Sequence, residues 1–406
     1  MRRLLGLSAY RRLLAAYALN ELAWGLGALT VSFLVYRRTG SAVGAAAFYL
    51  SALFVPALVA PMCVARIDHL APRLILPLLY AGEGLAFLAM GVVALHFSLP
   101  VILVLAFLDG TAALTARPLA RATTVAVTAP AGLLREGNAA NNLCFSIAFM
   151  LGPALGGAVV AAGGTSTSLF INAGVFTAMA VMLATAGMLP GPRPPSPAAR
   201  GGRVRAALRH ARERPMISRL LGLQAVAVLF FTLSIPVEVV YAQHTLRAGP
   251  GGYGALLTAW GAGAVLGSAV YARWNHFPSR FLIMAGAGLM GLGLAGMAAS
   301  PSLVPALVAA ALAGIGNGIE AIAARTAIQE EAHADWMALI MSFSESINEV
   351  APGVGIILGG AIAATSGSRT ALAVGGVGSL LVSVAAWGVL NPRREFRRVA
   401  AQRPPL

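Results

Sequence analysis

The recurrence of long apolar runs is the feature that most constrains the fold of this chain. Runs of roughly 20 apolar residues, the length that crosses a bilayer core as a helix, follow one another with short breaks. Only α-helices and closed β-barrels span a bilayer, because backbone polar groups inside the lipid must form hydrogen bonds with one another. We therefore predict an all-α integral membrane protein. Its twelve predicted spans are residues 13–36, 43–65, 74–96, 98–120, 139–162, 168–189, 220–243, 252–272, 281–299, 303–323, 337–364 and 370–390.

The composition supports a membrane protein over a soluble one. Hydrophobic residues make up 58% of the chain and charged residues 11%, against ~25% charged in soluble domains. The chain also holds 46 glycines and 23 prolines, and small residues let transmembrane helices approach closely. The first apolar run is too long for a cleavable signal peptide. Cys63 and Cys144 lie in separate spans and are interpreted as small core residues.

The net charge of +15 is explained by membrane topology rather than by nucleic-acid binding. All 29 basic residues are arginines, and with a cytoplasmic N-terminus 25 of them fall at or near the inner face. This asymmetry follows the positive-inside rule and predicts a multi-pass protein of the cell membrane with both termini in the cytoplasm. Anionic lipid headgroups are the expected partners of these arginines. The four arginines expected outside are Arg37, Arg38, Arg247 and Arg369.

The two halves of the chain repeat one another. Residues 65–73 (ARIDHLAPR) and 272–280 (ARWNHFPSR) lie 207 positions apart, each between two apolar runs. Residues 156–161 (GGAVVA) similarly match 359–364 (GGAIAA) at an offset of 203. Repeated halves of this kind are typical of membrane transporters. The pairs Gly110 with Gly314 and Arg121 with Arg325 add matches at an offset of 204.

The repeat and a proline-rich interruption predict the domain organisation. We expect an N-terminal six-helix bundle over residues 1–190 and a C-terminal six-helix bundle over 216–392, related by pseudo-two-fold symmetry. The segment 191–215 between them is predicted to be a cytoplasmic linker, because its first part is too rich in proline for a regular helix. Its second part is predicted to form a basic amphipathic helix. Residues 393–406 are predicted to be a basic cytoplasmic tail.

The first hairpin carries a motif that resembles the signature of the major facilitator superfamily. That signature is a G-x-x-x-D-R-x-G-R-R-like loop between spans two and three, and residues 64–73 keep Asp68 and Arg73 in it. Val64 and His69 stand where glycine and arginine are usual. The resemblance implies a loop that stabilises the outward-facing state, with Asp68 pairing with an arginine or capping a helix; a plain charged turn is the alternative. The predicted gating residues are Asp68, His69, Arg73, Asn275, His276 and Arg280.

Span five resembles the G-x-x-x-G-P-x-x-G-G motif of exporters in this superfamily. Residues 148–157 read AFMLGPALGG, with Ala148 in place of the first glycine. The glycines permit close helix contact and the proline bends the helix, although generic tight packing is the alternative. Residues 34–42 are similar to the bacterial siderophore and drug exporter subgroup. The motif residues are Gly152, Pro153, Gly156 and Gly157.

Acidic residues within the predicted spans are the candidate site residues, because buried charge is costly. By the resemblance, spans one, four, seven and ten line a central cavity. We assign Glu21 and Asp109 as the proton or cation site, with Glu320 secondary; alternatively, Asp109 pairs with Arg117 or another helix. Glu83 is a further buried acid of span three. The substrate-cavity candidates are Asn20, Trp24, Phe230, Phe231, Glu238, Asn317, Glu345 and Glu349.

Two of these candidates, Glu345 and Glu349, lie one helical turn apart on span eleven. They are candidates for the cavity, and the alternative is a packing face paired with Arg325 or another inner arginine. Span four also departs from the family. It lacks the mid-membrane arginine of many proton-coupled exporters, since Asp109 stands there and Arg117 follows eight residues later.

The function expected from these features is proton-coupled efflux of a small amphipathic molecule, such as a drug, siderophore or secondary metabolite. The transporter is expected to work by alternating access and as a monomer. The alternatives are uptake of a small metabolite and, from a different class, a membrane-embedded enzyme or a non-transporting scaffold. We predict no enzymatic activity, cofactor or metal, because no catalytic set, metal-ligand spacing or ATP-binding loop stands out.

Overall fold

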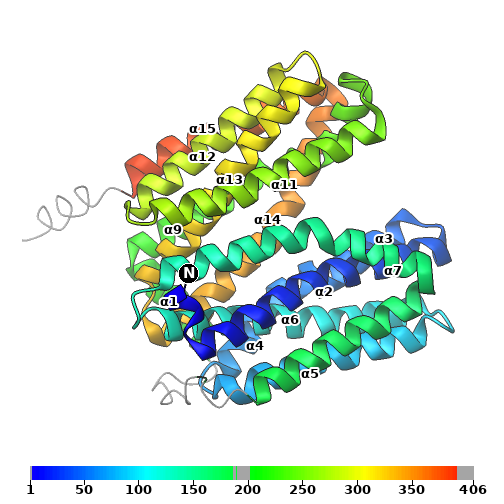
Figure 1. Ribbon diagram of the computed structural model, residues 1–406, viewed down its shortest axis with the longest axis vertical. Helices are drawn as coiled ribbons and strands as arrows, with labels where there is room; N and C mark the ends of the chain where they lie inside the picture. The colour runs from blue at the N-terminus through cyan, green and yellow to red at the C-terminus, as the bar shows by residue number, and fades with distance from the viewer. Residues whose placement is uncertain (1, 186–188, 190–201, 391–406) are drawn as a thin grey trace, which may run out of the picture. The chain divides into compact units, whose positions relative to one another are not determined.

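The computed structural model describes residues 2–185, 189 and 202–390, and nearly all of this part of the chain is helical (Figure 1). Eleven of the described helices are long and apolar enough to cross a membrane. The longest, α7 (Leu134–Ala184), has 51 residues, or about 75 Å, which is more than twice the thickness of a bilayer core. It is kinked at Gly164, where φ is 82° and ψ is 172°. Its two arms correspond to predicted spans 139–162 and 168–189, so the twelve-span, all-helical prediction is confirmed.

The chain divides into two compact units. Unit 1 comprises Met1–Glu213 and Ala332–Val350, and unit 2 comprises Arg214–Glu331 and Ala351–Leu406. Thus the first part of helix α14 (Met337–Ser366), predicted within the second half of the chain, groups with unit 1. The proline-rich part of the predicted linker and the 393–406 tail lie outside the described residues.

Unit 1 is a helical bundle built on four long packing contacts. Helix α7 packs against α2 and α5, while α6 packs against α4 and α5. Span two is continuous but passes through a five-residue π-helical segment, η1. The other elements of unit 1 are α1 (Arg2–Leu5), α2 (Ser8–Thr39), α3 (Ala42–Tyr49), η1 (Leu50–Phe54), α4 (Val55–Ile67), α5 (Pro72–Val93), α6 (Leu99–Thr128), α8 (Arg203–Glu213) and η4 (Ala334–Trp336).

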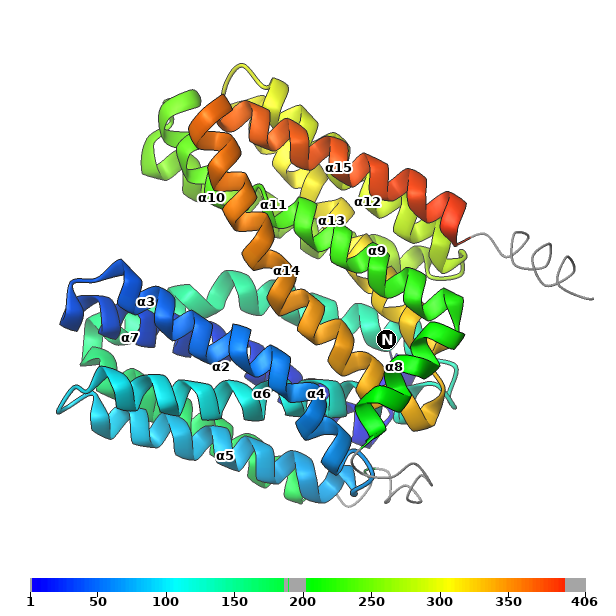
Figure 2. The same cartoon turned by 180° about the vertical axis from the view of Figure 1, so that it is seen from behind.

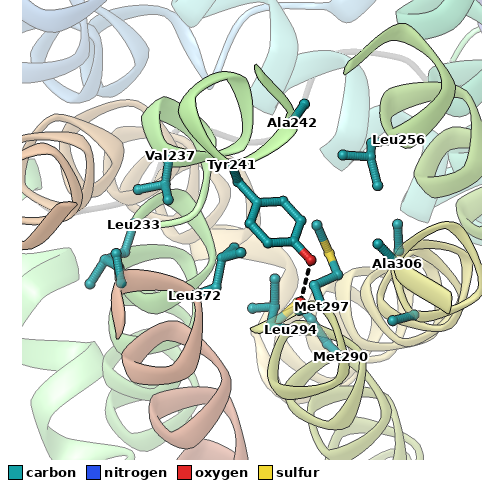
Figure 3. Close-up of a cluster of buried hydrophobic side chains, with 13 residues drawn as sticks. Leu233, Val237, Tyr241, Ala242, Leu256, Met290, Leu294, Met297, Ala306 and Leu372 are labelled. Atoms are coloured by element: carbon teal, nitrogen blue, oxygen red, sulfur yellow. Dashed lines mark hydrogen bonds between the residues drawn. The ribbon is translucent and has the colours of Figure 1, made fainter. Parts of the chain in front are cut away.

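Unit 2 packs α12 against α13 and α15, and α11 against α13. Its main core lies where span seven meets these helices (Figure 3). The Tyr241 side chain is fully buried there, and its hydroxyl donates a hydrogen bond to the carbonyl of Met297. The elements of unit 2 besides α14 are α9 (Pro215–Thr232), α10 (Ile235–Val240), η3 (Tyr241–Thr245), α11 (Gly249–Trp274), α12 (Ser279–Ala299), α13 (Leu303–Glu331) and α15 (Ser368–Val389).

The internal repeat is visible in how glycines pack within each unit. In unit 1, Gly110 of span four lies directly against the backbone carbonyl of Ala52 in span two. In unit 2, its counterpart Gly314 of span ten lies against the carbonyl of Trp260 in span eight. A β-carbon on either glycine would overlap the carbonyl oxygen that the glycine faces. This close helix crossing therefore requires glycine in both units. The two units therefore share one packing scheme, as the sequence repeat predicts.

A second crossing repeats in the same way. Gly152 and Gly156 of span five lie against Gly25 and Leu26 of span one, and a β-carbon at either would come 3.2 Å from a backbone α-carbon there. In unit 2 the equivalent positions are Gly355 and Gly359 of α14, which lie against the backbone around Leu233. Spans one and five thus cross as spans seven and eleven do.

Candidate functional site

Unit 1 contains a small cavity of about 30 Å³, which is space for about two water molecules. Its walls come from α2, from α3 and η1 of span two, and from α5, α6 and α7. The lining is mostly apolar and aromatic, and four strongly polar or charged side chains interrupt it. These four are Asn20, Glu83, Asp109 and Arg117.

Two of these side chains are carboxylates from neighbouring helices. Asp109 lies on α6, and Glu83 lies on α5 with only 1% of its surface exposed. Oδ1 of Asp109 and Oε1 of Glu83 are both buried and accept no hydrogen bond from the part of the chain that the structure describes. Glu83 also interacts electrostatically with Asp109 and Arg117. The sequence predicts Glu83 to be a buried acid, but the resemblance implies that span three lies outside the cavity and so does not assign Glu83 to the site.

Arg117 connects this cavity to helix α14. Its Nη1 donates a hydrogen bond to Oε1 of Glu349 at 3.2 Å, and its guanidinium lies over the Trp24 ring at 5.8 Å from the centroid. One turn further along α6, Nη1 of Arg121 lies 2.5 Å from Oε1 of Glu345. These two ion pairs, hereafter the α6–α14 ladder, join α6 to the part of α14 that belongs to unit 1. Glu345 and Glu349 are therefore placed against α6 arginines.

Glu21 lines a second cavity of unit 1, which has a volume of about 230 Å³. Trp24 lines both cavities, and Glu21 itself is 9% exposed. The negative charge of Glu21 also acts on Arg117. The predicted pair of Glu21 and Asp109 is thus divided between two cavities, with Trp24 and Arg117 as the shared neighbours.

Unit 2 has a smaller cavity of about 10 Å³. Glu238 lines it and accepts a hydrogen bond from Oγ of Ser234 at 3.2 Å. Phe231, a predicted cavity residue, also lines it and stacks on Trp260 with the ring centroids 5.7 Å apart.

Three other predicted residues of unit 2 lie in packing environments and do not line the cavities above. Phe230 packs against Gly375 and Gly378 of α15. Asn317 directs its amide nitrogen to the sulfur of Met290 at 3.8 Å. Glu320 is 7% exposed, and its charged neighbour is Arg325.

The hairpin after span two is held by the linker helix. Arg203, the first residue of α8, donates from Nε and Nη2 to the carboxylate of Asp68, with distances of 2.6–3.1 Å. The same Nη2 reaches the carbonyl of Asp335 at 3.1 Å, and the guanidinium lies 5.2 Å from the Trp336 ring centroid. Arg203 therefore joins the hairpin to the segment that precedes α14; α8 and α14 are visible in Figure 2.

The other predicted gating residues have different environments. His69 is half-buried and Arg73 is exposed. In the second hairpin, the ring of the exposed residue His276 lies 4.3 Å from that of Phe277, and Arg280 lies over the Trp387 ring at 5.9 Å. Asn275, which occupies the place of Asp68, is half-buried.

The span-five motif contacts span one through only some of its residues. Gly152 and Gly156 make the close contacts with α2 described above. On Gly157, no atom of the described residues outside the helix lies within 4 Å of the position of a β-carbon. The side chain of Pro153 lies outside the described residues.

Comparison by sequence identifies one family. The sequence model of the Major Facilitator Superfamily matches residues 220–405. No curated protein matches the chain.

Comparison by structure extends the likeness over the whole chain. The human organic anion transporter MFSD10 is 16% identical, with a TM-score of 0.78 and coverage of 93% of this chain and 99% of that one. A bacterial homologue of the iron transporter ferroportin, in the outward-facing state, is 16% identical, with a TM-score of 0.80 and coverage of 94% and 99%. The E. coli fucose:proton symporter is 14% identical, with a TM-score of 0.71 and coverage of 94% and 98%. The chain has the fold of these transporters.

Proposed function

We propose that this protein is a secondary transporter of the major facilitator superfamily that exports a small amphipathic molecule in exchange for protons. The observation that carries the proposal is the composition of the unit 1 cavity, in which transmembrane helices surround two carboxylates with apolar walls. Apolar walls interrupted by a few polar groups are the composition of small-molecule sites. In the alternating-access mechanism of this fold, the two repeats rock about a site near the bilayer midplane.

Glu21 and Asp109 are the proposed proton or cation sites, with Glu320 secondary. A buried carboxylate is costly as an anion, so it gains a proton or a cationic ligand when its cavity is closed and exchanges it when the cavity opens. The shared position of Trp24 and Arg117 between Glu21 and Asp109 supports coupling of these two acids. The fucose:proton symporter has the same fold, which supports protons as the coupling ion.

Export is the proposed direction, and uptake is the second candidate. The close packing of Gly152 and Gly156 on span one supports a rigid seal of the kind that the exporter motif implies. Uptake is favoured by the likeness to a symporter.

We propose a cell-membrane location with both termini in the cytoplasm, contacts with anionic lipids and a monomeric state. Asp68, held by Arg203, is the proposed gating contact.

The decisive experiment measures proton movement in proteoliposomes that contain the purified protein and an internal pH-sensitive dye. Ethidium, chloramphenicol and fluorescein serve as cationic, neutral and anionic amphipathic probes. We expect at least one probe to drive a proton flux opposite to its own movement. Proton flux in the same direction as the probe would establish uptake, and the absence of any probe-dependent flux would refute proton-coupled transport of these compounds.

The acid assignments are tested in the same vesicles. Glu21→Gln and Asp109→Asn should each abolish the coupled proton flux. The matched control is Glu213→Gln on α8, where the side chain is 67% exposed and the flux should be unchanged. Undiminished coupling in both cavity variants would remove the assignment.

A further inference from the structure

The second hairpin differs from the first at positions that the internal repeat matches. Both hairpins have two arginines at matched positions, which in the second are Arg273 and Arg280. Asn275 stands where the first hairpin has Asp68. Three aliphatic residues in and directly after the first hairpin are matched by aromatic ones at the offset of 207: Ile67 by Trp274, Leu70 by Phe277 and Leu74 by Phe281. The second hairpin therefore keeps the basic residues of the first, lacks its carboxylate and has a more aromatic surface.

The first hairpin is held by another part of the protein. Asp68 accepts the bidentate hydrogen bonds of Arg203, and helix α8 packs against α4 at this end. Asn275 is uncharged and half-buried, so it cannot form the equivalent ion pair. A partner of the second hairpin must therefore be bound by other groups.

The aromatic residues of the second hairpin form one exposed surface. The ring centroids of Trp274 and Phe277 lie 6.4 Å apart, and those of Phe277 and Phe281 lie 5.6 Å apart. Trp387, in the last turn of α15, is joined to them through Arg280, whose guanidinium lies 5.9 Å from its ring centroid. The four aromatic side chains are between 37% and 53% exposed. Exposed apolar surface of this kind marks an interaction site, and tryptophan is enriched at the level of the lipid headgroups.

Two arginines lie beside this aromatic surface. Arg273 is exposed in the last turn of α11, and Arg280 is half-buried against Trp387. A guanidinium binds a phosphate through two parallel hydrogen bonds. An acid is also near, since Glu330 of α13 accepts a hydrogen bond from Ser279 at 3.2 Å. Charge alone therefore does not define the ligand, and the rings beside the arginines favour an anion that carries apolar groups.

We propose that this second-hairpin surface binds an anionic phospholipid. The lipid phosphate lies between the two guanidiniums, and the glycerol and upper acyl groups lie against the aromatic rings. A free phosphate has no apolar group for these rings to contact, so the lipid is the ligand that uses the whole surface. A lipid thus holds the second hairpin as helix α8 holds the first. The site is one specific instance of the anionic-lipid contacts of the proposed function, and it rests on them. The surface consists of Trp274, Phe277, Phe281, Trp387, Arg273 and Arg280.

Quenching of tryptophan fluorescence by brominated lipids tests the proposal. The full-length protein is reconstituted in phosphatidylcholine vesicles that contain increasing fractions of brominated phosphatidylglycerol, and brominated phosphatidylcholine is the matched control lipid. We expect quenching by the anionic lipid that saturates at a low mole fraction, and weaker quenching without saturation by the control lipid. Trp274→Phe with Trp387→Phe should remove the saturating component, which assigns it to these two tryptophans.

Paired substitutions test the residues of the site. Arg273→Gln with Arg280→Gln should raise the half-saturating fraction of phosphatidylglycerol about tenfold or more, because each arginine near an anionic lipid contributes to binding. Phe277→Leu with Phe281→Leu gives these positions the residues of the first hairpin, keeps both tryptophans, and should raise that fraction about threefold. The matched control, at the same two arginine positions of the first hairpin, should leave it unchanged; this variant is Arg66→Gln with Arg73→Gln.

Three results would overturn the inference: no saturating component, equal effects of the two arginine pairs, or displacement by inorganic phosphate at constant ionic strength, which would assign the site to free anions. A cross-linked dimer that the double phenylalanine variant abolishes would instead assign the second-hairpin surface to a second copy of the chain. Melting temperatures in detergent check that each variant is folded. Arg273→Lys with Arg280→Lys keeps the charge and should retain most of the lipid preference. Quenching requires no substrate and no pH gradient, so its failure is distinguishable from failure of proton-coupled transport.

Discussion

Asp68 and Arg203 form a buried, bidentate ion pair. Their side chains are 2% and 9% exposed, and the contact is bidentate. Such a pair gives little net stability against an apolar substitute, but the loss of one partner strands a buried charge. Arg203 thus holds the linker helix to the hairpin. Substitution of only one partner of this ion pair should therefore lower the free energy of unfolding.

We predict that Arg203→Gln lowers the free energy of unfolding by about 3–5 kcal/mol, measured by denaturant unfolding of unit 1 in detergent. The double variant with Asp68→Asn should recover part of this loss, because the stranded carboxylate is removed. Arg209→Gln is the matched control on the same helix; its side chain is 75% exposed and lies 3.8 Å from Glu213. That variant should change stability by no more than about 1 kcal/mol. Equal effects of the two arginine variants would contradict the prediction.

Only part of this residue-level arrangement is predictable from the sequence. Asp68 was expected to pair with an arginine because its motif resembles a known loop, yet the partner comes from a linker 135 positions away. No local sequence pattern predicts a partner so far away along the chain. Similarly, Glu345 and Glu349 are recognisable as one helix face by their spacing, but their pairing with Arg121 and Arg117 depends on how α14 crosses α6.

At the scale of elements, the α6–α14 ladder fastens the first part of α14 to unit 1. Its arginine side chains are 12% exposed, and those of Glu345 and Glu349 are 5% and 17% exposed. The ladder is one of the contacts that join residues 332–350 to the first unit, whereas the repeat and the proline-rich segment place these residues in the second bundle.

We predict that the double variant Glu345→Gln with Glu349→Gln loosens this attachment. Two buried arginines on α6 lose their partners, so residues 337–350 should exchange backbone hydrogen faster, as measured by hydrogen–deuterium exchange. Helix α12, which belongs to unit 2, provides the internal control and should keep its protection. Unchanged exchange over 337–350 would show that apolar packing alone holds the helix.

Glycine contacts provide a second element-scale prediction. A β-carbon on Gly359 would overlap the carbonyl of Leu233, whereas at the adjacent Gly360 nothing lies within 4 Å. Gly359→Ala should therefore destabilise unit 2 by about 1–3 kcal/mol through overpacking, and Gly360→Ala should be neutral or slightly stabilising because alanine favours helix. Melting temperatures in detergent measure both. A smaller loss in the Gly359 variant than in the Gly360 variant would contradict the assigned crossing.

For the whole molecule, the number of spans and the internal duplication were predictable because bilayer thickness and repeated glycines leave a direct signature in the sequence. The bend at Gly164 lies in the break that the sequence predicts between spans five and six. The π-helical segment of span two was not predictable, because hydropathy is insensitive to local backbone geometry. Glu83 illustrates the same limit in the candidate site. Its burial follows from its position in an apolar run, but its approach to Asp109 follows only from the packing of α5 on α6.

Membrane orientation is a property of the whole chain, since 25 of 29 arginines fall on one predicted side. We predict that Ala129, between spans four and five, faces the cytoplasm and that Ser302, between spans nine and ten, faces outward; both residues are exposed. Cysteines are placed singly at these positions after Cys63→Ala and Cys144→Ala. A membrane-impermeant maleimide added to intact cells should label Ser302→Cys and spare Ala129→Cys until the cells are opened. The reverse pattern would invert the topology, and with it the proposed direction of export.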